Sequence, residues 1–96
     1  MYELRFTGAS ERYFKKIREK GLKLAYRNAL EKIRKDPYIG ELKTGDLTGI
    51  YGFDVFYNKT NYEIAYRVYE EENKLIVVIL AGTRENFYQE LKRYMK

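Results

Sequence analysis

The chain has 96 residues, of which 45% are hydrophobic and 34% charged, a composition that suits one globular domain and excludes a disordered chain. It contains no cysteine and no histidine, which excludes a disulfide framework, a thiol nucleophile and an imidazole base. Lys and Arg outnumber Asp and Glu by 19 to 14, and the net charge of +5 favours polyanionic partners such as nucleic acid.

Membrane and metal-dependent classes are also disfavoured. No apolar run approaches the roughly 20 residues that cross a bilayer, and the N-terminus lacks the apolar stretch of a secretion signal. No pairing of carboxylates resembles a metal cage. We therefore expect a single cytoplasmic domain over residues 1–96, with neither a metal nor a cofactor.

The first half of the chain predicts one strand and two helices. Apolar and polar residues alternate over 2–7, which indicates a half-buried strand. Helical periodicity then predicts helices over 11–20 and 22–35, and Asp36-Pro37 ends the second because the residue before proline disfavours helical geometry. Residues 38–46 are expected to form a loop.

The second half predicts three strands and a closing helix. Strand-like runs cover 49–57, 61–69 and 74–81, and their short polar connectors favour antiparallel pairing of neighbours. A last helix is expected over 84–94. The predicted fold is α+β, with a small antiparallel sheet of four strands, an N-terminal helical hairpin packed on one face, and a C-terminal helix.

The strand over 61–69 has one apolar face and one charged face. Its even-numbered positions from Tyr62 to Val68 are apolar, whereas Glu63 and Arg67 point to the opposite side. Simple hairpin geometry sets Phe56 opposite Glu63 on one neighbouring strand and Leu80 opposite Glu63 on the other. The charged face is therefore where we expect chemistry.

Two further residues are expected to close over one end of this face. They are Arg84, just past the last strand, and Tyr88, one helical turn later. RNA cleavage by a 2′-hydroxyl needs a proton acceptor, a proton donor and positive charge beside the phosphate. Glu63 suits the first role, and the guanidinium forks of Arg67 and Arg84 suit the last. Equally, Glu63 and Arg67 can form an exposed cross-strand ion pair, with Tyr88 a core aromatic; spacing alone leaves both readings open.

Tyrosine is unusually frequent, with 11 in the chain. On a basic surface tyrosines can stack on bases, but they also populate strand surfaces and protein interfaces. Both interpretations remain open for five of them: Tyr51, Tyr57, Tyr62, Tyr69 and Tyr88.

Four features together resemble a known superfamily. They are the N-terminal strand with its helical hairpin, the bridge IRKDPYIGELKTGDLTGIYGF (33–53), the strands YEIAYRVYEEENKLIVVIL (62–80) and the tail AGTRENFYQELKR (81–93). Over nearly its whole length the chain is similar to the RelE/ParE superfamily of bacterial toxins, which come from two-gene toxin–antitoxin modules. The resemblance implies a compact toxin that a cognate antitoxin neutralises by wrapping around it.

In the RelE branch, the resemblance implies an mRNA endoribonuclease that cuts the message in the ribosomal A site of the 30S subunit. Arg84 and Tyr88 match that branch's late arginine and its C-terminal tyrosine. Other positions depart from it, because Asp54 and Phe56 stand where the branch carries lysines and Glu63 stands where it carries an arginine. The alternatives are a non-catalytic ParE-like toxin that inhibits DNA gyrase, or an inactive member of the superfamily.

Overall fold

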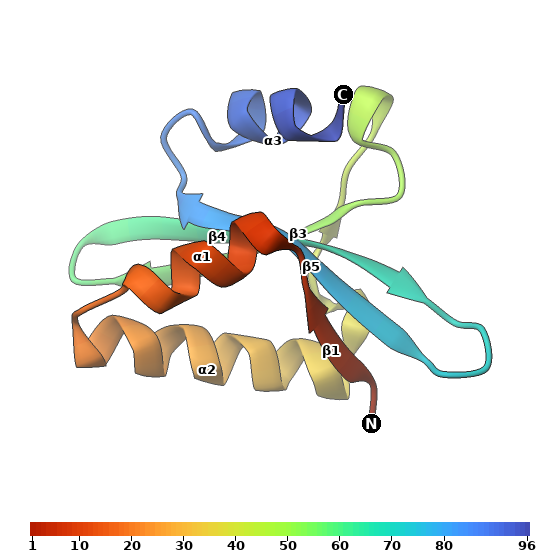
Figure 1. Cartoon of the computed structure of the whole chain (residues 1–96), viewed down its shortest axis with the longest axis horizontal. Coiled ribbons are helices and arrows are strands. Elements are labelled where there is room, and N and C mark those ends of the chain that lie inside the picture. Colours follow the sequence, from red (N-terminus) through yellow and green to blue (C-terminus); the bar gives the residue numbers. More distant parts are fainter.

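The computed structural model describes all 96 residues (Figure 1). Its elements are, in chain order, β1 (Glu3–Phe6), α1 (Gly8–Lys16), α2 (Lys20–Lys35), β2 (Glu41–Leu42), β3 (Tyr51–Tyr57), β4 (Thr60–Tyr69), β5 (Leu75–Thr83) and α3 (Phe87–Met95). Short 3-10 turns at Pro37–Ile39 and Gly45–Leu47 flank β2. None of the helices has the length and apolarity of a membrane span.

The strands form one five-stranded sheet in the order β1-β5-β4-β3-β2. The predicted α+β class and the antiparallel pairing of β3, β4 and β5 are confirmed. The strand number differs, because the segment expected to be a loop contains β2, which pairs with β3. In addition, β1 runs parallel to β5. Short connectors fix the relative direction only of strands that follow one another in the sequence. The direction of β1 relative to β5 could therefore not be predicted from them.

The helices cover both faces of the sheet. Figure 1 shows α2 below the sheet and α3 above it. The larger core lies between the sheet and the helical hairpin, where Ile33, Ile64 and Tyr66 are fully buried. The smaller core lies under α3 and includes Ala65 and Leu91. Alternate residues of β4 therefore face opposite cores, and Glu63 lies on the α3 side with Ala65.

Three predicted helix boundaries were wrong for local reasons. The first helix begins at Gly8 rather than at residue 11, because the Thr7 side chain caps it by accepting a hydrogen bond from the Ser10 backbone N–H. The first helix ends at Lys16, and Gly21 lies in the first turn of α2 rather than at a helix end. There an added Cβ would lie 2.8 Å from the Tyr57 ring, so glycine permits a close approach. The last helix begins at Phe87, because Arg84 still donates a backbone hydrogen bond to Asn61 and continues the sheet.

The register around Glu63 also differs from simple hairpin geometry. The β3–β4 turn is shorter than assumed, with Asn58 and Lys59 both at positive φ, so Asp54 and not Phe56 lies opposite Glu63. On the other side, the β4–β5 pairing is shifted by one residue from the turn onward and by a second at an irregularity between Ala65 and Tyr66, so Gly82 and not Leu80 lies opposite Glu63.

Candidate active site

Glu63 is the centre of the candidate site. It projects from β4 toward α3 and is 1% exposed, which is rare for a glutamate. The neighbouring strands leave space for it, because Gly82 lies directly opposite on β5, and Gly52 lies on β3 two residue pairs along, opposite Ala65. A Cβ added at Gly52 would clash with the Glu63 carboxylate and would lie 3.1 Å from the Tyr88 hydroxyl.

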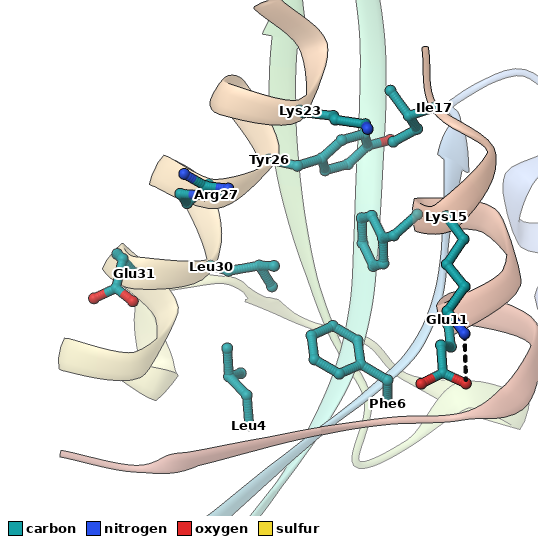
Figure 2. A pocket seen from close by; sticks show the side chains of 11 residues that line it. Leu4, Phe6, Glu11, Lys15, Ile17, Lys23, Tyr26, Arg27, Leu30 and Glu31 are labelled. Carbon is teal, nitrogen blue, oxygen red and sulfur yellow. Dashed lines mark ion pairs between the residues drawn. The ribbon is translucent and has the colours of Figure 1, made fainter. Parts of the chain in front are cut away.

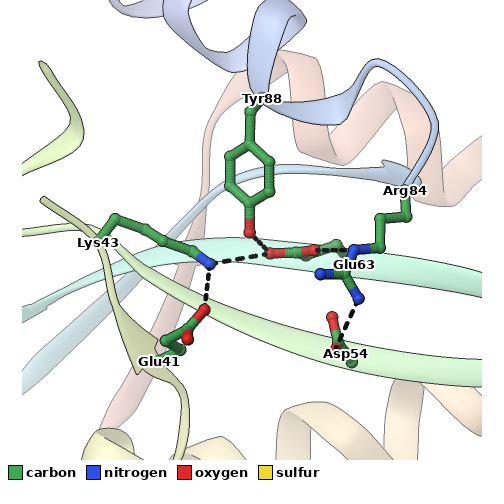
Figure 3. A network of polar contacts seen from close by, with 6 residues as sticks. All are labelled: Glu41, Lys43, Asp54, Glu63, Arg84 and Tyr88. Atoms are coloured by element: carbon green, nitrogen blue, oxygen red, sulfur yellow. Dashed lines mark hydrogen bonds and ion pairs between the residues drawn. The ribbon is translucent and has the colours of Figure 1, made fainter. Parts of the chain in front are cut away.

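Arg84 and Tyr88 reach Glu63 from the segment that follows β5, as predicted (Figure 3). The Tyr88 hydroxyl donates a hydrogen bond to Oε2 of Glu63. The Arg84 guanidinium lies between two acids, with Nε 3.9 Å from Oε1 of Glu63 and Nη1 3.4 Å from Oδ2 of Asp54. Asn86, in the left-handed region at φ 61°, turns the chain into α3 and so brings Tyr88 back over the sheet.

Lys43 belongs to the same cluster and was missed from the sequence. Its Nζ lies 3.8 Å from Oε2 of Glu63, 2.6 Å from Oε1 of Glu41 and 4.6 Å from the centre of the Tyr88 ring. It follows β2, whose pairing with β3 carries it to the site. The only signal was a polar–apolar–polar alternation over Glu41–Lys43, which is too short to predict a strand.

Arg67 does not join this cluster. It lies on the same face of β4 as Glu63 but takes no part in the ion pairs of the site. Its guanidinium lies instead beside the turn at Gly49, where an added Cβ would be 2.8 Å from Nη1. The structure thus brings Glu63, Arg84 and Tyr88 together and leaves Arg67 further along the strand.

Burial sets the acid–base properties of Glu63. Desolvation raises the pKa of its carboxyl group from 4.5 to about 7. Coulombic attraction to Lys43 and Arg84 lowers this pKa, whereas the nearby Asp54 raises it. Oε1 is buried and has no hydrogen-bond partner, in contrast to Oε2. Glu63 is therefore a carboxyl group with a free acceptor oxygen and a pKa near neutrality, which suits a general base.

A polar pocket of about 390 Å³ gives access to this group. Its lining residues are Ile39, Gly40, Glu41, Lys43, Gly52, Phe53, Asp54, Glu63 and Arg84. No group of three or more acidic side chains is arranged to hold a metal ion. Besides the buried proton acceptor Glu63, the pocket holds the two cations Lys43 and Arg84, which suit an anionic substrate, and the two further acids Glu41 and Asp54.

A second, more apolar pocket of about 470 Å³ lies at the helical hairpin (Figure 2). Its lining includes the aromatic residues Phe6, Phe14 and Tyr26 and charged residues such as Glu11 and Lys15. No charged group in it is buried, which makes it a weaker candidate for catalysis.

The tyrosines considered for base stacking occupy different environments. Three of them, Tyr51, Tyr57 and Tyr62, pack against the larger core under the helical hairpin. Tyr69 is 42% exposed at the far end of β4, away from the pocket. Only Tyr88 lies at the candidate site.

Comparison with known proteins gives a consistent family and fold. Residues 4–92 match the model of a family described as ParE-like toxin of type II bacterial toxin–antitoxin systems. A chain of the intact E. coli RelBE toxin–antitoxin complex superposes with a TM-score of 0.68 at 20% identity, covering 85% of this chain and 95% of that one. For the RelBE2 complex of Mycobacterium tuberculosis the TM-score is 0.66 at 23% identity, with coverages of 86% and 98%.

The free form of an E. coli RelE mutant also superposes, with a TM-score of 0.69 at 20% identity and 96% of each chain covered. At these identities the structural likeness establishes the fold. No curated protein matches the sequence significantly.

Proposed function

This chain belongs to the family of ParE-like toxins of type II bacterial toxin–antitoxin systems, and from that premise we propose that it is a ribosome-dependent mRNA endonuclease that arrests translation. The resemblance to RelE/ParE toxins seen in the sequence is confirmed at the level of the family. One observation carries the proposal of catalysis: the buried Glu63 carboxyl group has a free oxygen beside Arg84 and Tyr88. A cognate antitoxin is the proposed partner that neutralises the toxin, since the similar RelBE structures are toxin–antitoxin complexes.

The proposed reaction is attack of a ribose 2′-hydroxyl on the adjacent phosphorus. Oε1 of Glu63 takes the hydroxyl proton as the new O2′–P bond forms and the P–O5′ bond breaks. Tyr88 gives a proton to the departing O5′ and regains one from Glu63, so the protein ends unchanged. The products are a 2′,3′-cyclic phosphate and a 5′-hydroxyl.

Arg84 stabilises the charge that develops on the phosphoryl oxygens, since its guanidinium lies next to the proposed base. Arg67, on the same face of β4 but outside the cluster, holds a phosphate further along the message. The net charge of +5 favours approach to the polyanionic ribosome and message.

The test is an in-vitro translation reaction in which the message is mapped for cuts in the 30S A site. The wild-type protein is expected to arrest translation and cut the message. Arg84→Ala is expected to lower the cleavage rate by about 100-fold or more, the usual effect of removing one transition-state donor. Arg93→Ala, an exposed arginine on α3, is the matched control and is expected to retain the wild-type rate.

Arrested translation with an intact message would rule out cleavage. A folded Arg84→Ala protein that cuts at the wild-type rate would remove Arg84 from the mechanism.

The second candidate is a non-catalytic toxin that inhibits DNA gyrase. One observation favours it: the pocket holds three carboxyl groups, from Glu41, Asp54 and Glu63, against the two cations Lys43 and Arg84. With all five groups ionised, the negative charges outnumber the positive ones, and the pocket repels phosphate. A gyrase supercoiling assay separates the candidates, because inhibition by a protein that leaves messages intact supports gyrase as the target. Normal growth at high expression without an antitoxin would instead indicate an inactive member.

A further inference from the structure

Lys43 is held in a way that a surface lysine rarely is. Its side chain is 17% exposed, whereas its closest charged partner, Glu41, is 78% exposed. The buried part of the lysine lies against the Tyr88 ring and the Glu63 carboxylate. An ammonium group is seldom buried to this extent without compensating charge. The nearest compensating group is thus an exposed surface acid.

The pocket has the shape of a subsite around this ammonium. Figure 3 shows Lys43 and Arg84 approaching Glu63 from opposite sides, with Tyr88 above. A Cβ added at Gly52 would lie 2.8 Å from Cε of Lys43, so glycine at this position lets the lysine stem lie where it does without moving. Oε1 of Glu63, which lines the same pocket, is a buried acceptor without a partner. Two cations and a vacant acceptor are the groups that a phosphate with a neighbouring hydroxyl would contact.

We infer that Lys43 binds a backbone phosphate of the RNA, and that in the free protein the Glu41 carboxylate occupies the position of that phosphate. The identity of the ligand as RNA rests on the proposed function. The placement of Lys43 and Glu41 stands on the contacts just described.

The strengths of the interactions support this exchange. An ion pair with a largely exposed partner such as Glu41 contributes little to stability, so Glu41 is readily displaced into solvent. A phosphate oxygen forms a stronger, charge-assisted hydrogen bond with the ammonium. Displacement of Glu41 also removes one negative charge from the pocket. The excess of negative charge in the pocket, which repels RNA in the free protein, therefore becomes smaller when RNA binds.

The test measures binding separately from cleavage. The probe is a short 2′-O-methyl RNA oligonucleotide, which lacks the nucleophilic hydroxyl and so cannot be cut, and its affinity for the purified protein is measured over a series of salt concentrations. Lys43→Met is expected to weaken binding about tenfold or more. It should also reduce the slope of log affinity against log salt by about 0.7, the value for one phosphate contact on a single strand. Glu41→Gln is expected to tighten binding by up to about fivefold.

Two variants control for charge and folding. Lys32→Met removes an exposed lysine of α2 and is expected to leave affinity unchanged. Lys43→Arg keeps the positive charge and is expected to restore most of the affinity that Lys43→Met loses. Circular dichroism and thermal melting establish that each variant is folded.

Several outcomes would overturn the inference. They are wild-type affinity in a folded Lys43→Met protein, unchanged or weaker binding by Glu41→Gln, and no measurable binding by the wild type. A Lys43→Met protein that binds normally and only shifts the pH profile of cleavage would make Lys43 a positioning residue. Failure of the proposed function is distinct, because a wild-type protein that cuts no message can still bind the probe through Lys43.

Discussion

At the scale of single residues, Glu63 links folding to chemistry through its protonation. Its pKa is about 7 in the folded protein against 4.5 for an unperturbed glutamate, because burial disfavours the charged form. Below pH 4.5 the group is protonated in both folded and unfolded chains, and its neutral form is fully accommodated. Between pH 4.5 and 7 the unfolded chain releases this proton while the folded protein, which disfavours a buried charge, retains it. Stability is therefore lost over this interval, and the loss is complete as the pH rises through 7.

We therefore predict a pH-dependent difference between the wild type and Glu63→Gln. The free energy of unfolding of the wild type, relative to that of the variant, should fall by up to about 3 kcal/mol as the pH rises from 4.5 to above 7. Urea denaturation of both proteins at several pH values measures this difference. A constant difference across the interval would show that Glu63 does not titrate there.

The same titration should appear in cleavage. The rate should rise with pH and level off above about 7, since only the ionised carboxylate accepts a proton. Glu63→Gln should be about 100-fold slower or more above pH 7, and the difference should shrink as the pH falls below 7 and the wild-type carboxylate becomes protonated.

The sequence made three of the four clustered site residues predictable. Strand alternation placed Glu63 on the charged face, and the turn after the last strand placed Arg84 and Tyr88 near it. Lys43 was beyond reach because its position depends on β2, a strand of two residues whose pairing is set by its partner β3. Arg67 shares the correct face, but the distance along β4 and the irregularity near Ala65 separate it from the cluster.

At the scale of elements, β3 shapes the site because it has no side chain at position 52. Gly52 is buried, and a side chain there would meet the Glu63 carboxylate, the Lys43 stem and the Tyr88 hydroxyl. Simple hairpin geometry placed Phe56 and not Asp54 opposite Glu63, because it assumed too long a turn between β3 and β4. The correct register follows from the two-residue turn at Asn58 and Lys59.

We predict that Gly52→Ala destabilises the protein by about 1–3 kcal/mol, the usual effect of overpacking. It should also abolish most cleavage, because Glu63, Lys43 and Tyr88 can no longer lie together. Gly82→Ala is the matched control on the other neighbouring strand, since nothing lies within 4 Å of its added Cβ. Thermal melting and the translation assay measure both effects. Equal behaviour of the two variants would contradict the proposed role of Gly52.

At the scale of the whole molecule, the sheet separates two hydrophobic cores, only one of which lies beside the candidate site. The core under the helical hairpin holds most of the buried apolar residues, and the core under α3 forms one wall of the site. The division into a helical hairpin, a sheet and a closing helix was predictable from periodicity and turn residues. The parallel pairing of β1 was not, because it joins segments far apart in the sequence.

We predict that the two cores can be distinguished by mutation. Leu91→Ala and Ile33→Ala each remove a fully buried side chain, one from each core, and each should cost about 2–5 kcal/mol. At temperatures where both variants remain folded, Leu91→Ala should cut messages more slowly, because α3 positions Tyr88. Ile33→Ala should keep the wild-type rate. Equal losses of rate would show that α3 does not govern the site independently.

The order in which the site residues occur along the chain has a consequence for synthesis. Lys43 and Glu63 leave the ribosome first, but Arg84 and Tyr88 emerge only after β5, the strand that β1 also needs as its neighbour. A nascent chain therefore carries an incomplete candidate site until β5 and the start of α3 have been made. Under the proposed function, the nascent chain cannot cleave a message before the segment that carries Arg84 and Tyr88 has been made.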